Sequence, residues 1–529
     1  MSHPASRRKS VRGLLLLPLL LLVLHACGDP GQTRERAQGS VLWVTPEALP
    51  ELGAEARETL LAAGVRELFV EAGRLADGGS GVEGLLAASP RSELRLPVTL
   101  VVHGAWAEAT DPLAYGDDAG TGLAEDLASL RRTAEAKGLT VVGYHLDVDA
   151  VTAEEGLTRL ADSLEALGEA LAEAGDGKWL SLTVAPDSLA VEGFADVADQ
   201  VDFLVPFLYG ARDTGRPGPD PARAWDPAIA EAALPRLQAL GKAYLLGIGT
   251  RGLLQRVDGD GMVLKATSSA SLKPLIDRPD LEISFGGLDT AMRQRLLFQA
   301  TEPLHLGGWR LATGDRVQVV RPAVSHLRAA ARRAAEATPD LHLGQAYVRL
   351  PAADERISLG LPAIAAAAGE GEPELALEVE VVADGRGRSR LRLRLVNPGP
   401  LSSDVAQLET NYLHVHAVGG ATIASIDAGG FQRYQLELDG RRVRDMRSLR
   451  RADSVRLYLP LIEAGDEVES GPLVLRGAPG DGPVLRVGGR FAVPGGGEVV
   501  LPEQVWPAPP EPEAEPEEAA AQAAAGDTP

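Results

Sequence analysis

A regular alternation of short apolar runs with amphipathic stretches, between Val41 and Ala334, most constrains the fold of this chain. The runs predict strands and the stretches between them predict helices, giving about eight βα steps. That rhythm fits an α/β fold, a TIM-like (β/α)8 barrel over residues 41–345. A doubly wound sheet is the alternative, although no Gly-rich phosphate loop follows the first strand. The predicted strands are 41–44, 66–72, 94–104, 139–149, 179–186, 201–210, 243–249 and 304–311.

Beyond residue 345 the character of the sequence changes. Residues 346–373 include an Ala- and Gly-rich stretch and predict a linker. From 374 to 503 apolar residues alternate with polar ones between Gly- and Pro-rich turns, which predicts an all-β sandwich domain, Ig-like in form. Residues 504–529 are rich in Pro, Glu and Ala and predict a disordered tail.

The first 27 residues predict an export signal rather than part of the fold. A basic stretch precedes the apolar run 13–24, which Pro18 interrupts and which is short for a membrane span. The run ends in "LHAC", which resembles a bacterial lipoprotein signal whose Cys becomes the lipidated first residue. The resemblance implies an anchor at Cys27, and Gly28 after it favours the outer membrane. Residues 28–40 then form a polar tether.

Cysteine and charge exclude several classes of protein. Cys27 is the only cysteine, so neither an internal disulfide nor a Cys-based zinc site can form, and we expect no metal or cofactor. The net charge is −22, and removing residues 1–26 takes away four positive side chains to leave −26. A chain this acidic is a poor nucleic-acid binder and repels anionic membranes. A lipid anchor is therefore the expected membrane attachment.

The strand "GYHLDVDA" (143–150) carries an unusual polar face. Its alternation puts His145, Asp147 and Asp149 on one side. Positions two apart on a strand are about 6.6 Å apart at the backbone, and two carboxylates that close disfavour joint ionisation, which would leave one of them as an acid. The structural alternative is that they cap a loop or pair with Arg251 or Arg310. The helix after this strand is expected to begin with a capping box of Thr152 and Glu155.

Polar and aromatic side chains also end the other predicted strands. In a barrel the carboxyl ends of the strands meet at one mouth. Carboxylates with a phenol and an indole in one cleft suit sugar recognition, through acid chemistry on glycosidic oxygens and stacking on the rings. Each of these residues has a structural alternative, and for Trp309 that alternative is the core. The residues expected at the mouth besides the two aspartates and His145 are Glu71, His103, Tyr209, Trp309 and Arg310.

"YHLDVDAV" (144–151) resembles the fourth-strand signature Asp-Gly-x-Asp-x-Asp-x-Glu of chitinase-type, family-eighteen glycoside hydrolases. Asp147 and Asp149 match its second and third Asp, and "VDFLVPFLYG" (201–210) resembles the sixth strand, with Tyr209 on the active-site Tyr. The resemblance implies Asp147, Asp149 and Tyr209 as catalytic residues. Val151, however, stands where the family has its proton-donating Glu. Chitinase activity is therefore not implied.

The chain also resembles an uncharacterised family of bacterial secreted or lipid-anchored proteins with a glycosidase-like barrel. Residues 141–171, 180–189 and 306–317 carry that resemblance. Three functions remain open: an envelope-anchored enzyme acting on a cell-wall or extracellular glycan, a glycan-binding barrel without catalysis, and a structural lipoprotein whose β domain docks a protein partner. In the first, Glu154 or Glu155 could replace the missing Glu. The missing Glu favours the second, and the costly Asp pair favours the first.

Overall fold

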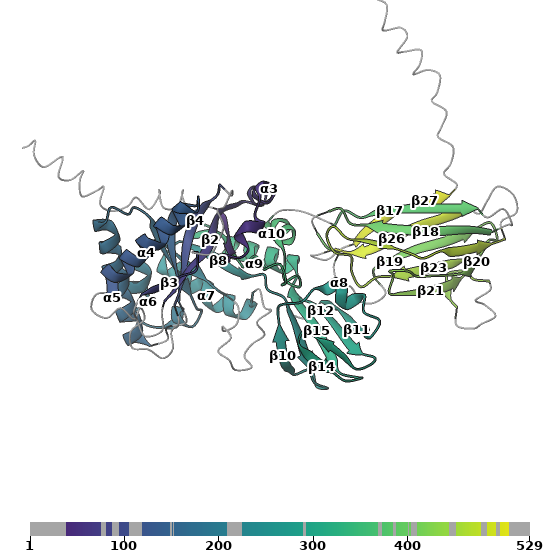
Figure 1. Ribbon diagram of the computed structural model, residues 1–529, viewed down its shortest axis with the longest axis horizontal. Coiled ribbons are helices and arrows are strands. Elements are labelled where there is room, and N and C mark those ends of the chain that lie inside the picture. Colours follow the sequence, from purple (N-terminus) through teal and green to yellow (C-terminus); the bar gives the residue numbers. More distant parts are fainter. Residues whose placement is uncertain are drawn as a thin grey trace, which may run out of the picture. The chain divides into compact units, whose positions relative to one another are not determined.

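The chain divides into two compact units. Unit 1 comprises residues 1–251 and 327–353, and unit 2 comprises residues 252–326 and 354–529. Figure 1 shows the computed structural model with its elements. The structure describes residues 39–75, 81–86, 95–104, 119–148, 151, 153–208, 225–288, 293–368, 373–383, 388–399, 401–403, 410–443, 451–477, 484–493 and 498–506.

Unit 1 is a closed barrel of eight parallel strands. They pair in the order β1-β2-β4-β5-β6-β7-β8-β16, and β16 pairs with β1 to close the ring. A short strand, β3 (Val82–Gly84), adds to β2 in antiparallel fashion. The TIM-like barrel predicted from the βα rhythm is therefore confirmed. The barrel strands are β1 (Ser40–Val44), β2 (Val65–Leu75), β4 (Pro97–His103), β5 (Thr140–Asp147), β6 (Trp179–Val184), β7 (Phe203–Pro206), β8 (Tyr244–Gly249) and β16 (His342–Val348).

Helices follow the strands along the chain, as α4 and α5 do on the outside of the sheet (Figure 1). The leucines of α5 at three- and four-residue spacing are buried, as an amphipathic helix requires. The helices are α3 (Ala54–Ala62), α4 (Ala119–Ala136), α5 (Glu154–Glu173), α6 (Phe194–Asp199), α7 (Pro227–Leu240) and α9 (Val324–Ala337), with 3-10 turns at Leu49–Glu51 and Ser188–Ala190. None of the helices described is long and apolar enough to cross a membrane.

The start of α5 differs from the expected capping box. Ala153 rather than Thr152 is the N-cap residue, and it makes no side-chain capping hydrogen bond. Glu155 instead pairs with Arg159 one turn later, on the exposed side of the helix. The acidic residues Glu154 and Glu155 in the first turn still suit the positive end of the helix dipole.

Residues 252–322, which lie between β8 and α9, form a separate antiparallel sheet. Its strand order is β10-β9-β15-β12-β11, beside the hairpin of β13 and β14. This sheet has its own apolar core, to which Phe298 and Trp309 belong. Its elements are β9 (Leu253–Val257), β10 (Val263–Thr267), α8 (Leu272–Ile276), β11 (Leu281–Leu288), β12 (Arg293–Ala300), β13 (Leu304–Leu306), β14 (Trp309–Leu311) and β15 (Arg316–Pro322).

The strand predicted at 304–311 is therefore not a barrel strand. That segment is the β13–β14 hairpin. The eighth barrel strand is β16, which is not among the strands predicted from the sequence. The error has a physical origin, because an alternating apolar pattern is shared by any half-buried strand.

Two further sheets form the β-sandwich after helix α10 (Leu361–Ala368), which confirms the all-β domain predicted there. One sheet has the order β17-β18-β25-β20 with β24 beside β18, and the other has the order β22-β21-β23-β19-β26-β27. Leucines and valines from both sheets share one core. The strands are β17 (Ala376–Ala383), β18 (Arg388–Val396), β19 (Tyr412–Val418), β20 (Thr422–Ser425), β21 (Arg433–Leu438), β22 (Arg441–Arg442), β23 (Ser454–Tyr458), β24 (Glu467–Glu469), β25 (Leu473–Arg476), β26 (Val484–Ala492) and β27 (Glu498–Trp506).

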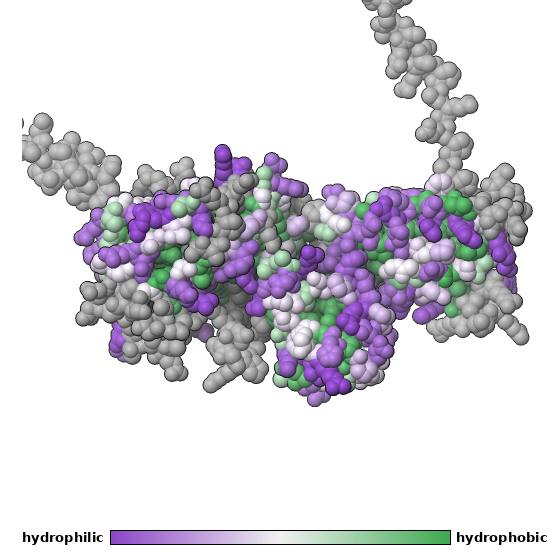
Figure 2. Space-filling view, in the orientation of Figure 1, coloured by the Kyte–Doolittle hydropathy of each residue, from purple (hydrophilic) through white to green (hydrophobic). Residues whose placement is uncertain are grey.

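The surface of the described chain is mostly hydrophilic in the view of Figure 2, with smaller hydrophobic patches between. This distribution agrees with the acidic composition of a chain with 74 Asp and Glu residues. The large apolar side chains lie mainly in the cores named above.

Candidate ligand-binding site at the carboxyl end of the barrel

Asp147 is fixed at the carboxyl end of β5 by its neighbours on both sides. Its Oδ2 lies 2.7 Å from Nδ1 of His103, at the end of β4. Its Oδ1 accepts a hydrogen bond of 2.7 Å from the hydroxyl of Thr183, near the end of β6. Because three adjacent parallel strands end here, the barrel alone brings these side chains together.

Glu71 extends this group across β2. Its Oε1 accepts a hydrogen bond of 3.2 Å from Nε1 of Trp43 on β1. Its Oε2 lies 3.6 Å from Nε2 of His103, which is an ion-pair distance rather than a hydrogen bond. The side chains of His103 and Glu71 are 23% and 18% exposed, whereas that of Asp147 is 8% exposed. The Nδ1 atom of His103 is bonded to Asp147 and its Nε2 atom is buried, so Glu71 is the charged group of the three that is most open to a ligand.

His103 lies between two acidic side chains, and this decides its charge. Burial alone would lower the pKa of its imidazole, but the contacts to Asp147 and Glu71 outweigh burial and raise the pKa to about 9. His103 is therefore an imidazolium at neutral pH, and it donates its Nδ1 proton to Asp147. The site thus presents a fixed positive charge between two acids, with a Trp at its side.

His145 supports this group from below and does not reach the mouth. It is fully buried, with its ring 5.2 Å from that of Trp43 and 5.0 Å from that of Phe69. Its Nε2 lies 2.8 Å from the Thr183 hydroxyl, whose single proton goes to Asp147. His145 must therefore donate from Nε2. Its predicted role as a ligand contact is corrected to that of a positioning residue for Thr183.

An apolar residue, Val151, occupies the position at which the chitinase-type signature has its proton-donating Glu. Val151 is half-buried, and its backbone N–H donates a hydrogen bond of 3.1 Å to the hydroxyl of Ser188. Glu155 is engaged with Arg159, away from the strand ends. Glu71, on the neighbouring barrel strand β2, combines a carboxyl group with partial exposure and a contact to His103.

The remaining predicted site residues have different outcomes. Asp149 and Tyr209 lie outside the described residues and stay predictions. Trp309 and Arg310 are on the β13–β14 hairpin of unit 2, where Trp309 is buried in the core and Arg310 is exposed, so they are not on a barrel strand. The sequence analysis missed Trp43 and Thr183. Their signal was present, because both lie near the carboxyl end of a predicted strand.

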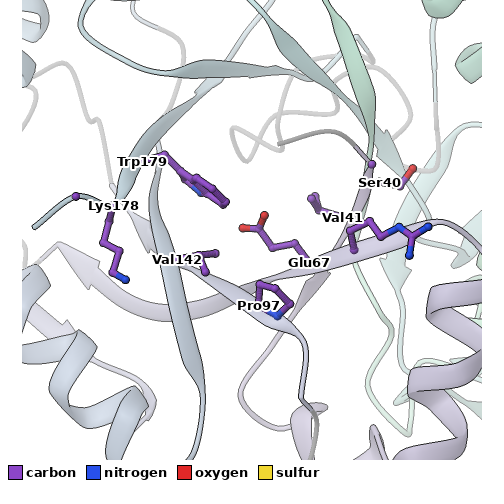
Figure 3. Close-up of a pocket in the computed structure, with 10 residues that line it drawn as sticks. Ser40, Val41, Glu67, Pro97, Val142, Lys178 and Trp179 are labelled. Carbon is purple, nitrogen blue, oxygen red and sulfur yellow. The ribbon is translucent and has the colours of Figure 1, made fainter. Parts of the chain in front are cut away.

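The opposite, amino end of the barrel contains a cavity of about 370 Å³. Figure 3 shows the Glu67 carboxyl group and the Trp179 indole pointing toward each other there, with Val142 and Pro97 beside them. The Thr99 hydroxyl donates to Glu67 and accepts a hydrogen bond of 3.0 Å from Nε1 of Trp179. Burial raises the pKa of Glu67 to about 7, against the opposing hydrogen bonds from Thr99 and Trp179.

Among the described residues, no group of three or more His, Cys, Asp or Glu side chains is arranged to hold a metal ion. The Glu71, His103 and Asp147 group is consistent with that result. Its imidazole nitrogens both face acidic side chains, so neither is directed at a common point that a metal could occupy.

Comparison with known proteins gives distant structural similarity only. No protein-family model matches the chain, and no curated protein matches it. A family 18 N-acetylglucosaminidase from Paenibacillus barengoltzii is 15% identical and covers 62% of this chain and 99% of its own, with a TM-score of 0.41. A family 18 chitinase variant from Cycas revoluta, solved with (GlcNAc)4, is 14% identical over 62% and 99%, with a TM-score of 0.41. A chitinase-like agglutinin from Robinia pseudoacacia is 12% identical over 62% and 98%, with a TM-score of 0.39.

Proposed function

We propose that the carboxyl end of the barrel binds a glycan, as part of an exported, lipid-anchored envelope protein. One observation carries the proposal: Glu71, His103 and Asp147 form a fixed row of charged groups at the mouth, next to the indole of Trp43. Such carboxylates suit sugar recognition, because sugar hydroxyls donate hydrogen bonds to them. The predicted contacts of Asp149 and Tyr209 would extend the same site.

Binding without cleavage is the better supported activity. Cleavage of a glycosidic bond needs a carboxylic acid that protonates the leaving oxygen. Val151 occupies the position at which the resemblance to chitinase-type enzymes puts that acid. An apolar side chain there cannot donate a proton. The site therefore keeps groups that hold a polar ligand without the group expected to cut it.

Hydrolysis is a second candidate because of Glu71. Its carboxyl group is partly exposed at the mouth and lies beside the proton-rich imidazolium of His103. As the carboxylate paired with this imidazolium, Glu71 could act as a general base that activates a water molecule, rather than as the proton donor of the chitinase-type arrangement. The two candidates differ in a measurable product, since only hydrolysis creates new reducing ends.

The test uses the chain from Gly28 to Pro529 with fragments of peptidoglycan, chitin and exopolysaccharide. Binding is followed by calorimetry and cleavage by reducing ends. The variants are Glu71→Gln and Asp147→Asn, and the matched control is Glu169→Gln, an exposed acid on α5. Loss of a charged hydrogen bond should weaken binding on the order of tenfold or more in the two site variants. The control should bind as the unchanged chain does.

Each result decides between the candidates. Binding that weakens in both site variants without new reducing ends supports the binding function. New reducing ends that disappear in Glu71→Gln establish hydrolysis by that residue. If no fragment binds or is cut while urea unfolding shows all four proteins folded, the glycan proposal is wrong for these polymers. The structural lipoprotein would then be the remaining candidate.

A further inference from the structure

Strand β18 of the sandwich carries four arginines on one face. Its residues alternate, so that Leu391, Leu393 and Leu395 enter the core of the sandwich. The residues between them point outward, as the two-residue period of a strand requires. These outward residues are Arg388, Arg390, Arg392 and Arg394.

One half of this row is neutralised by acids on the neighbouring strands. The guanidinium of Arg394 lies 3.0 Å from Glu378 on β17 and 3.6 Å from Glu469 on β24, and it also pairs with Glu467. Arg392 is directly opposite Glu380 on β17. Cross-strand pairs of opposite charge stabilise a sheet, so this half has a structural explanation.

The other half has no such explanation among the residues that the structure describes. Arg390 lies between Val382 on β17 and Val474 on β25. Arg388 is directly opposite Arg476 on β25, and both are exposed. Like charges directly opposite each other destabilise a sheet. Three neighbouring arginines for which the described residues supply no acid are also unexpected in a chain with a net charge of −22.

We propose that Arg388, Arg390 and Arg476, here called the arginine face, bind an extended anionic polysaccharide that carries carboxylate groups. Arg388 and Arg390 lie about 6.6 Å apart along β18, and Arg476 lies across from Arg388 on β25, so the three residues form an extended patch rather than a point site. Guanidinium groups pair with carboxylates through two parallel hydrogen bonds. A thread-like polymer can follow the arginine face alone. A planar anionic membrane would also meet the acidic half around Glu378 and Glu469, which disfavours it.

The test measures binding of polygalacturonate to the chain from Gly28 to Pro529, with dextran as the neutral polymer. The main variant is Arg388→Gln combined with Arg390→Gln. The matched control is Arg394→Gln on the same strand, because three acids already neutralise that guanidinium. We expect the double variant to lose on the order of tenfold in affinity and the control to change less than about twofold. Binding should also weaken as salt rises.

A second variant tests the charge argument without removing an arginine. Val382→Glu puts an acid opposite Arg390, as Glu380 is opposite Arg392, at a position that is 52% exposed and can accept it. It should weaken polygalacturonate binding as the double variant does. Glu169→Gln, at an exposed acid on α5, should leave this binding unchanged. Val382→Glu should leave the binding of neutral chitin fragments unchanged, so failure of the barrel site and failure of the arginine face can be told apart.

Three results would overturn the proposal. The first is equal binding of polygalacturonate by the unchanged chain and the double variant. The second is equal binding of dextran and polygalacturonate. The third is binding of phosphatidylglycerol vesicles that depends on Arg388 and Arg390 while polygalacturonate does not bind, which would make the arginine face a membrane contact.

Discussion

Glu67 is a buried acid at the amino end of the barrel, and its hydrogen-bond partner there is a hydroxyl rather than a base. A carboxylate in such surroundings loses its hydration without gaining an opposite charge. The folded protein therefore favours the neutral acid, which is why the pKa of Glu67 rises to about 7. The Glu71, His103 and Asp147 group at the other end is different, because there an imidazolium supplies the compensating charge.

Glu67→Gln should make the protein more stable at neutral and higher pH. A raised folded pKa means that stability is fully present below about pH 4.5 and is lost as the pH rises through 7. The loss amounts to about 3 kcal/mol, and the amide of Gln, which cannot ionise, avoids it. Urea unfolding between pH 4.5 and 8 should therefore show a flatter profile for the variant.

The exposed acid Glu169 gives the control, since Glu169→Gln should leave the profile unchanged. His103 also has a raised pKa, so its contribution is present below about pH 6.5 and is lost through 9, mostly above the range of Glu67. Parallel profiles for Glu67→Gln and the unchanged chain would contradict a protonated Glu67.

For individual residues, the sequence predicts the charged side chains at the strand ends better than the buried side chains beneath them. The face shared by His145 and Asp147 follows from strand alternation, and the strand-end rule places Glu71 and His103. Alternation cannot tell whether a side chain on that face reaches the mouth or is buried beneath it, because depth depends on the neighbouring strands. His145 and Glu67 therefore had no distinguishing signal.

Within the barrel strands, glycine makes room for an aromatic ring. A Cβ at Gly143 of β5 would lie 1.9 Å from Nε1 of Trp179 and 2.6 Å from the Thr99 hydroxyl. Gly247 of β8 stands in the same relation to Phe207. A strand interior usually disfavours glycine, so both positions reflect the space that a closed barrel leaves for large side chains.

Gly143→Ala should destabilise the protein by about 3 kcal/mol, because the added methyl group overlaps the Trp179 ring. Combined with Trp179→Phe, which shortens that ring, it should cost less than the sum of the two single changes. Urea unfolding of the four proteins measures this coupling. Gly168→Ala is the control, since its Cβ meets nothing within 4 Å and the substitution favours the helix. Strict additivity would show that the ring and the added methyl do not compete.

The hairpin at residues 304–311 shows a limit of predicting strands from apolar alternation alone. Residues 304–311 alternate as a strand does, but Gly307 and Gly308 in their middle both have positive φ. A Gly-Gly pair between alternating residues is the signal of a tight hairpin, and this signal was available in the sequence. The true eighth strand, β16, pairs with β8 and β1, which are far from it along the chain. Only the closed sheet identifies it.

For the whole molecule, the net charge bears on how the protein could attach to a membrane. The mature chain would carry −26, which repels anionic lipid surfaces, so the proposed membrane association would depend on a lipid at Cys27. Cys27→Ser should move the protein from the membrane fraction to the soluble fraction of a producing bacterium. Mass spectrometry of the purified chain should show the lipid on the unchanged protein only. Undiminished membrane association of the variant would refute the anchor.

The position of β16 has a consequence for the order in which the molecule can be made. Seven barrel strands precede residue 250, but the eighth comes after the whole antiparallel sheet of residues 252–322. If the chain folds as it is made, its first seven barrel strands can form only an open sheet, with β1 and β8 at the two free edges, until β16 is made. Free edges invite pairing with other chains. The antiparallel sheet thus separates the synthesis of the first seven barrel strands from that of β16, which closes the barrel.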